Sequence, residues 1–270
     1  MAEIDDPLSY AVIGMAMAAH RELGPGLDEA FYHELLARKL TAAGIPHETK
    51  PRGKLLHRGR VADEFEADLI VEGRLAAELK VLWGDFAPEH LLQLICYLKF
   101  WRLDAGLLFD FAKESLAQKR VPRLDRATAF DPASMQPESP VSGSERSLVR
   151  EILDSLHAVL TEFGLGYRDS TYRGLLLAEL LHRKIPCAEH PTVAIRSGDV
   201  LLGEAKLPCL ILPGQAALLI TALRETRQAA DRAVLQTCLR HLDLTWGLLL
   251  NFGKTRLDCQ LVKPPMRRSG

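Results

Sequence analysis

The chain has 270 residues, of which 47% are hydrophobic and 26% charged, as expected of a folded protein with one large or two ordinary domains. The net charge of -1 gives no support to nucleic-acid binding through bulk charge alone, although an acidic metal site would offset basic residues elsewhere. The N-terminal residues are acidic and polar, and no apolar run reaches membrane-spanning length, so we expect a cytoplasmic protein without membrane contact.

The first half of the chain predicts two helices, three extended segments, a third helix and a final strand. Apolar residues recur at helical spacing in the first helix, and Asp28 and Glu29 lie in the first turn of the second, where the helix dipole favours carboxylates. The turn Glu72–Gly73 joins the last two extended segments as a hairpin. In chain order the predicted elements are helices Leu8–Leu23 and Asp28–Ala43, extended segments Pro46–Leu56, Ala62–Val71 and Leu75–Leu82, helix Pro88–Trp101 and strand Gly106–Phe111.

The second half of the chain repeats the first. Leu23–Pro46 aligns with Phe163–Pro186, and Ala105–Ala112 aligns with Trp246–Gly253, in the same order and at similar spacing. A Pro/Ser-rich stretch between the halves has the composition of a linker. We therefore predict two tandem α/β domains at residues 1–126 and 147–270, joined by a linker at 127–146. Each would contain a mixed central sheet flanked by helices, and the two could form an intramolecular pseudo-dimer.

Three charged residues lie within the apolar hairpin of the first half. Strand alternation places Glu78 and Lys80 on one face, and the turn at Glu72–Gly73 brings Asp68 opposite or diagonal to Glu78. Two neighbouring carboxylates repel each other unless positive charge lies between them, and Lys80 together with a divalent cation would supply it. Oxygen ligands suit Mg²⁺. The alternative is a cross-strand salt bridge on an exposed hairpin face.

Further polar residues are placed to support such a site. Glu29 could add a third carboxylate, or could simply stabilise the first turn of its helix. Gln93 and Tyr97 share one face of the helix Pro88–Trp101, where they could orient Lys80 or hold a nucleic-acid strand, or lie at a helix–sheet boundary. Tyr32 recurs as Tyr172 in both halves, which favours a packing role.

These motifs together resemble a known family. The D-x(9)-E-x-K pattern of Asp68, Glu78 and Lys80 resembles the PD-(D/E)XK nuclease superfamily, and Q-x(3)-Y on the next helix resembles its RecB-like branch. More narrowly, ELGPGLDEAFY, ADLIVEG, AELK and GLLFDF resemble the bacterial GxxExxY proteins. The resemblance implies a Mg²⁺- or Mn²⁺-dependent nuclease. Its metal ligands would be Asp68, Glu78 and Glu29, and its catalytic residues would be these three with Lys80, Gln93 and Tyr97.

The second half departs from this pattern. Aligned on Pro213–Gly214, it carries Cys209, Leu219 and Thr221 where the first half has Asp68, Glu78 and Lys80. Without these charges nothing would hold a cation, so we predict that the second copy is catalytically inactive and serves as a structural partner or a DNA-binding surface.

A group of basic residues in the first half could contact DNA phosphates, although a solvated edge strand explains them equally well. They are Lys50, Arg52, Lys54, Arg58 and Arg60. We predict a metal-dependent phosphodiesterase that acts on DNA in repair, recombination or defence. A non-catalytic nucleic-acid-binding or scaffold module is the main alternative, and a hydrolase of small phosphates is a third. The sequence identifies no protein partner.

Overall fold

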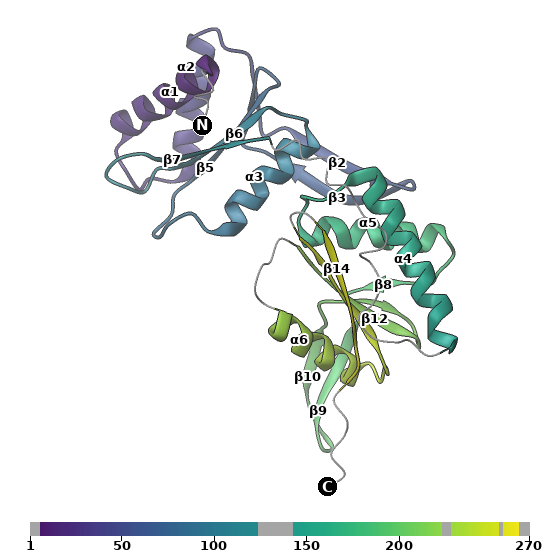
Figure 1. The fold of residues 1–270 in the computed structure, drawn as a ribbon. Coiled ribbons are helices and arrows are strands. Elements are labelled where there is room, and N and C mark those ends of the chain that lie inside the picture. The colour runs from purple at the N-terminus through teal and green to yellow at the C-terminus, as the bar shows by residue number, and fades with distance from the viewer. Residues whose placement is uncertain (1–5, 124–142, 223–227, 254–255, 265–270) are drawn as a thin grey trace. The chain divides into compact units, whose positions relative to one another are not determined.

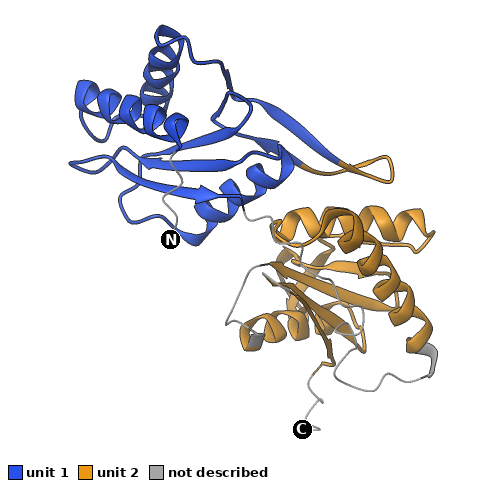
Figure 2. Ribbon diagram, turned by 45° about the horizontal axis from the view of Figure 1, so that its top comes forward, with its two compact units in different colours: residues 1–55, 64–125 blue, residues 56–63, 126–270 orange. Residues whose placement is uncertain are grey.

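The computed structural model describes residues 6–123, 143–222, 228–253 and 256–264. The chain divides into two compact units, Met1–Leu55 with Glu64–Asp125 and Leu56–Asp63 with Arg126–Gly270 (Figure 2). Most of the predicted linker, up to residue 142, lies outside the described residues, and its last residues belong to helix α4, which begins at Gly143. Among the described residues, the helices lack the combination of length and hydrophobicity that a membrane span requires.

The first unit is a five-stranded mixed sheet with helices on both faces (Figure 1). Its strand order is β1-β4-β5-β6-β7, in which β5 and β6 are parallel and the other neighbours antiparallel. Strands β2 and β3 form a separate hairpin. The elements are α1 Pro7–Leu23, α2 Glu29–Ala42, β1 His47–Thr49, β2 Arg52–His57, β3 Arg60–Glu66, β4 Leu69–Val71, β5 Leu75–Lys80, α3 Pro88–Phe100, β6 Ala105–Asp110 and β7 Ala117–Pro122.

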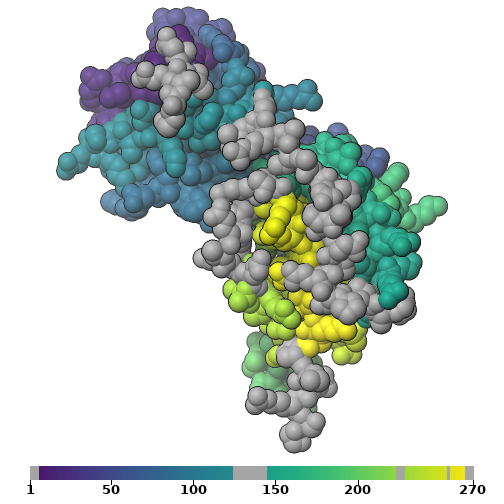
Figure 3. All heavy atoms as spheres, in the orientation of Figure 1, coloured from purple at the N-terminus to yellow at the C-terminus, as the bar shows by residue number. Residues whose placement is uncertain are grey.

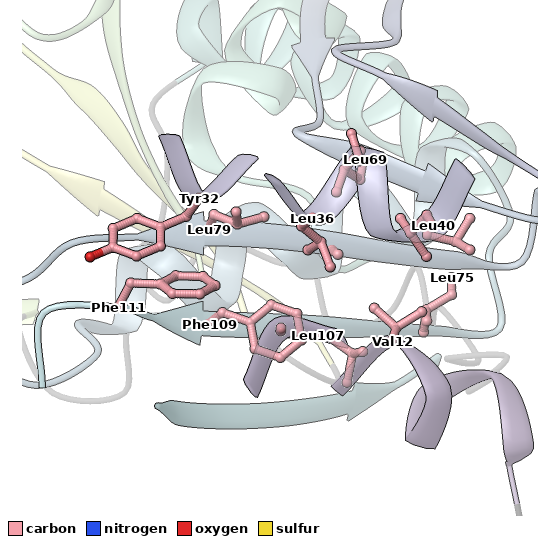
Figure 4. Packing of buried hydrophobic residues seen from close by; sticks show 14 of the residues in the cluster. Val12, Tyr32, Leu36, Leu40, Leu69, Leu75, Leu79, Leu107, Phe109 and Phe111 are labelled. Atoms are coloured by element: carbon pink, nitrogen blue, oxygen red, sulfur yellow. The ribbon is translucent and has the colours of Figure 1, made fainter. Parts of the chain in front are cut away.

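Alternation along β5 divides its side chains between two environments. Leu75, Ala77 and Leu79 join the buried cluster formed with α1 and α2 (Figure 4). The residues between them face the other side, which α3 covers. There a Cβ on Gly106 would lie only 2.6 Å from the Leu94 side chain, so α3 approaches β6 at a distance that only glycine permits.

The second unit repeats this architecture. Its five-stranded sheet has the order β8-β11-β12-β13-β14, again with one parallel pair, β12 and β13, and β9 and β10 form a separate hairpin. The elements are α4 Gly143–Phe163, α5 Asp169–His182, β8 Ala188–Glu189, β9 Thr192–Ser197, β10 Val200–Lys206, β11 Leu210–Leu212, β12 Ala216–Ala222, α6 Gln228–His241, β13 Gly247–Phe252 and β14 Leu257–Val262. The predicted fold, two mixed sheets flanked by helices, is confirmed.

The structure adds detail that the sequence patterns did not predict. The predicted segment Pro46–Leu56 is two strands, because Lys50 adopts a left-handed φ of 48° and Pro51 has no N–H to continue the ladder. Ala62–Val71 likewise falls partly in β3 and partly in β4. The edge strand β7 was not predicted, because its half-exposed polar sequence lacks an apolar alternation. Side chains close the spaces between the ribbons of each unit (Figure 3).

Residues 56–63, the tip of the β2–β3 hairpin, belong to the second unit. Within that unit the carboxylate of Asp63 accepts hydrogen bonds from Arg168 and Thr171. A Cβ on Gly174 of α5 would lie 2.0 Å from the carbonyl oxygen of Ala62, so the absence of a side chain at Gly174 allows the two backbones to approach closely.

Candidate active site

The centre of the site is the end of β5. Glu78 and Lys80 lie on the same face, and Lys80 Nζ donates a hydrogen bond to Glu78 Oε1 at 2.7 Å. Glu78 is only 2% exposed. Burial and the nearby Asp68 charge raise the pKa of the Glu78 carboxyl, the charge and hydrogen bond of Lys80 partly offset them, and the net pKa is about 7. Burial lowers the pKa of Lys80, but the charge and hydrogen bond of Glu78 outweigh it and the net direction is upward.

Asp68 precedes β4 and turns toward β5. Its Oδ2 accepts a hydrogen bond from the backbone N–H of Leu79 at 2.8 Å, which fixes one carboxylate oxygen beside the strand that carries Glu78 and Lys80. The charge of Asp68 acts on Glu78, Lys80 and Glu29. The structure therefore brings together the three residues of the D-x(9)-E-x-K pattern.

The Gly-x-x-Glu-x-x-Tyr segment is a turn that positions Glu29. Gly26 has a φ of 81°, and its N–H donates to the carbonyl of Phe111. The Tyr32 hydroxyl donates to the carbonyl of Gly24 at 2.5 Å, accepts from the N–H of Leu27 at 3.1 Å, and its ring stacks on Phe111 (Figure 4).

Glu29 itself is the first residue of α2. The N-cap residue Asp28 accepts a hydrogen bond from the N–H of Ala30 and so stabilises the start of this helix. Burial raises the pKa of Glu29, the positive charge of Lys80 opposes this, and Asp68 adds to it. These electrostatic interactions indicate that Glu29 lies near both Lys80 and Asp68.

Gln93 and Tyr97 form a pair of their own on α3. Gln93 Nε2 donates to the Tyr97 hydroxyl at 2.6 Å, and that hydroxyl donates to the carbonyl of Glu66. Tyr97 is 3% exposed. The pair holds α3 against the end of β3, two residues before Asp68.

Two residues that the sequence did not single out support the site. His33 Nε2 donates to the carbonyl of Asp68 at 2.9 Å and so links α2 to the start of β4. Asp110, 1% exposed and paired with Lys80 across β5 and β6, accepts from the N–H groups of Leu82 and Ala112, each at 3.0 Å. A carboxylate inside the apolar run AGLLFDF was a visible signal for Asp110, whereas His33 had none.

Three of the five basic residues predicted to bind nucleic acid form ion pairs. Arg52 pairs with Glu66 at 2.6 Å, and Lys54 pairs with Glu64 at 3.2 Å. Arg58 lies in the hairpin tip that belongs to the second unit, where it pairs with Glu179 at 2.8 Å. Within the described part of the chain, Lys50 and Arg60 form no ion pair.

The donor set at this site suits a hard divalent cation. Glu78 Oε2 is buried and has no hydrogen-bond partner within the described part of the chain, which is costly unless another group occupies that position. Carboxylate oxygens are the ligands that Mg²⁺ prefers, and Mg²⁺ commonly takes one or two of them and keeps several waters. In the described ranges, no three His, Cys, Asp or Glu side chains form a metal-binding cluster.

The second copy keeps the surrounding packing and lacks the charges. Its register places Cys209, Leu219 and Thr221 at the positions of Asp68, Glu78 and Lys80. Cys209 and Leu219 are part of a buried hydrophobic cluster, and Thr221 donates to Asn251 at 3.1 Å.

The turn that precedes the second sheet is nevertheless the same in both copies. The Tyr172 hydroxyl donates to the carbonyl of Gly164 at 2.9 Å and accepts from the N–H of Tyr167 at 3.2 Å, and its ring stacks on Phe252. Tyr32 and Tyr172 thus make equivalent contacts whether or not the charged residues are present.

Comparison with known proteins agrees with the fold. The family model described as "PD-(D/E)XK nuclease superfamily" matches residues 6–124 and again residues 146–263. The chain therefore belongs to the PD-(D/E)XK nuclease superfamily, in two tandem copies. No curated protein matches the chain. A solved structure described as "Crystal structure of SSO0001" is similar over 47% of this chain and 57% of its own length, at 18% identity and a TM-score of 0.29.

Proposed function

We propose that the first copy is a divalent-cation-dependent nuclease that hydrolyses phosphodiester bonds in DNA, and that it belongs to the GxxExxY branch of its superfamily. The second copy is catalytically inactive in this proposal. The observation that carries the proposal is the buried Glu78 carboxylate, whose Oε2 has no hydrogen-bond partner in the described ranges although Oε1 is paired with Lys80. Superfamily membership supports a nuclease-like activity in general.

Asp68 and Glu78 would hold Mg²⁺ or Mn²⁺, with Glu29 as a further carboxylate nearby. The bound cation would polarise the scissile phosphate and lower the pKa of a bound water. Lys80 remains 18% exposed while it is paired with Glu78, so its ammonium group can also donate to a water or phosphate oxygen. Gln93 and Tyr97 keep α3 and Glu66 in place and so fix the approach to Asp68.

Lys50, Arg52, Lys54, Arg58 and Arg60 remain proposed contacts to DNA phosphates. Their contribution would be sequence-independent, because phosphate contacts position a strand without reading its bases. Arg52 and Lys54 are strongly exposed in their ion pairs, with side-chain exposures of 80% and 64%, and exposed pairs exchange partners at little cost.

The test is a cleavage assay on purified protein. Wild-type protein is incubated with single-stranded and double-stranded DNA in Mg²⁺, in Mn²⁺ and in EDTA, beside Asp68→Ala and Lys80→Ala. Thr221→Ala, at the position of Lys80 in the second copy, is the matched control. We expect cation-dependent cleavage that both first-copy variants abolish and the control retains. Cleavage that survives both first-copy substitutions would exclude this site.

A non-catalytic nucleic-acid-binding module is the second candidate. The absence of a three-residue metal cluster in the described part of the chain favours it. Under this alternative, wild-type protein and Asp68→Ala bind DNA equally well, and no cation gives cleavage in the same assay.

A further inference from the structure

Trp83 lies three residues after Lys80, the last residue of β5, and is 100% exposed. The other two tryptophans are packed: Trp246 is 3% exposed, and the Trp101 ring packs against Tyr97 and Phe100. A bare indole leaves a large apolar surface in water, which is unfavourable unless that surface meets something. Its complete exposure beside the proposed site therefore requires an explanation.

The backbone on both sides of Trp83 is held in place. The carboxylate of the buried Asp110 accepts from the N–H of Leu82 at 3.0 Å. Lys113 Nζ donates to the carbonyl of Gly84 at 2.7 Å and to that of Leu82 at 3.4 Å. Hydrogen bonds thus anchor the loop just before and just after Trp83, while its ring extends fully into solvent. This is the arrangement of a preformed contact surface.

Trp83 is also close to the proposed site along the chain. Three residues of extended chain span at most about 11 Å, so the Cα atoms of Trp83 and Lys80 are no farther apart than that. Bases stacked along one strand are about 3.4 Å apart, and a base within a few nucleotides of a phosphate at Lys80 is therefore accessible to Trp83. In the second copy the aligned sequence position is Arg224, which lies outside the described residues, so the tryptophan accompanies only the copy with the charged site.

We propose that Trp83 stacks on an unpaired nucleobase of the strand whose phosphate occupies the site of Asp68, Glu78 and Lys80. Every base has a π-face on which an aromatic ring can stack, but in a continuous duplex both faces are covered by neighbouring bases. The preferred substrate is then single-stranded nucleic acid, or a duplex with a frayed end. This inference rests on the proposed nuclease function and adds the class of substrate.

The test measures binding separately from cleavage. The affinities of a fluorescein-labelled oligo(dT) 20-mer and a blunt 20-bp duplex are measured by fluorescence anisotropy in EDTA. The proteins are the wild type, Trp83→Ala and Trp83→Phe, with Tyr10→Ala as the control because Tyr10 is 63% exposed on α1. We expect Trp83→Ala to weaken binding of the single strand by about 5-fold to 150-fold. Trp83→Phe should keep most of the affinity, and duplex binding should not change. Intrinsic tryptophan fluorescence should be quenched by oligo(dT) in the wild type and much less in Trp83→Ala.

Single-strand affinity and quenching that are equal in wild type and Trp83→Ala would overturn the inference, and so would a wild type that binds no single strand. Parallel cleavage assays in Mg²⁺ separate the two proposals. If Asp68→Ala abolishes cleavage while Trp83→Ala neither binds nor cleaves single strands differently from wild type, the nuclease proposal stands and the stacking inference falls. If no protein cleaves but the Trp83-dependent binding persists, the nuclease proposal falls and the stacking contact stands.

Discussion

Because of Glu179, we expect the second unit to lose stability as the pH becomes acidic. Its carboxylate, 1% exposed on α5, accepts hydrogen bonds at 2.8 Å from His57, Arg58 and Arg183. His57 and Arg58 come from the hairpin tip that belongs to this unit. Burial raises the pKa of Glu179, but the hydrogen bonds from Arg58, Arg183 and His57 outweigh it and lower the pKa to about 2.

The magnitude follows from the difference between this pKa and the ordinary value of 4.5. At about 1.4 kcal/mol per pKa unit, the ionised carboxylate stabilises the folded unit by about 3 kcal/mol. Arg58 and Arg183 are 38% and 34% exposed, so water screens part of this interaction and we expect about 1–3 kcal/mol. Because the folded pKa is lowered, this stability is present above about pH 4.5 and is lost as the pH falls toward 2.

The perturbation is Glu179→Gln, with Glu204→Gln as the control because Glu204 is exposed on β10 of the same unit. Urea unfolding is followed by circular dichroism and by fluorescence of the buried Trp246 between pH 7 and pH 3. Glu179→Gln should lower the free energy of unfolding by about 1–3 kcal/mol at pH 7, and the difference from wild type should shrink as the pH falls. The control should stay within about 0.5 kcal/mol of wild type. A difference that is the same at pH 7 and pH 3 would refute the reasoning.

Three further predictions concern the tyrosine contacts of both copies, the position of Glu78 in the second copy, and the support of Asp68. Tyr32→Phe and Tyr172→Phe each remove a hydroxyl that pairs with a glycine carbonyl and with a backbone N–H. Each substitution should therefore lower the free energy of unfolding in urea by about 1–3 kcal/mol. Loss of cleavage by Tyr32→Phe at unchanged stability would contradict a structural role. Leu219→Glu buries a carboxylate without the lysine partner that Glu78 has, and it should lower the free energy of unfolding by about 3–5 kcal/mol. Leu219→Met, the control, should lower it by less than about 1.5 kcal/mol. Equal urea midpoints for the two variants would disprove this. His33→Ala removes the hydrogen bond to the Asp68 carbonyl. It should raise the Mg²⁺ concentration that gives half-maximal cleavage by about 10-fold to 100-fold. An unchanged Mg²⁺ titration would show that His33 does not position Asp68.

The fold was predictable because local sequence patterns determine its elements and because the sequence repeats these patterns in its second half. Alternation placed Glu78 and Lys80 on one face of a strand, and the Glu72–Gly73 turn fixed the register that brings Asp68 beside them. The internal repeat then gave the second sheet. Strand β7 was missed because an exposed edge strand needs no apolar alternation.

The contacts that complete the site depend on residues far apart in the chain. His33 and Asp68 are 35 residues apart, and Leu82 and Asp110 are 28 apart. No periodicity in the sequence relates such pairs, because each depends on how α2 or β6 packs against β5. For the same reason, the contacts of the hairpin tip with α5 were not predictable: Gly174 has no local role as a turn, and its function as a close-approach site is visible only beside Ala62.

The two copies also separate what the fold requires from what the site adds. The tyrosine hydrogen bonds to a glycine carbonyl and stacks on a phenylalanine in both, so the fold needs these contacts with or without charged residues. At the position of Glu78, however, the second copy folds with Leu219 inside a hydrophobic cluster. A leucine there costs no desolvation, whereas the carboxylate of Glu78 is buried with one oxygen lacking a hydrogen-bond partner in the described ranges. Since the fold accommodates a leucine at this position, stability alone does not explain the carboxylate, whereas the cation that we propose would bind its unpaired oxygen.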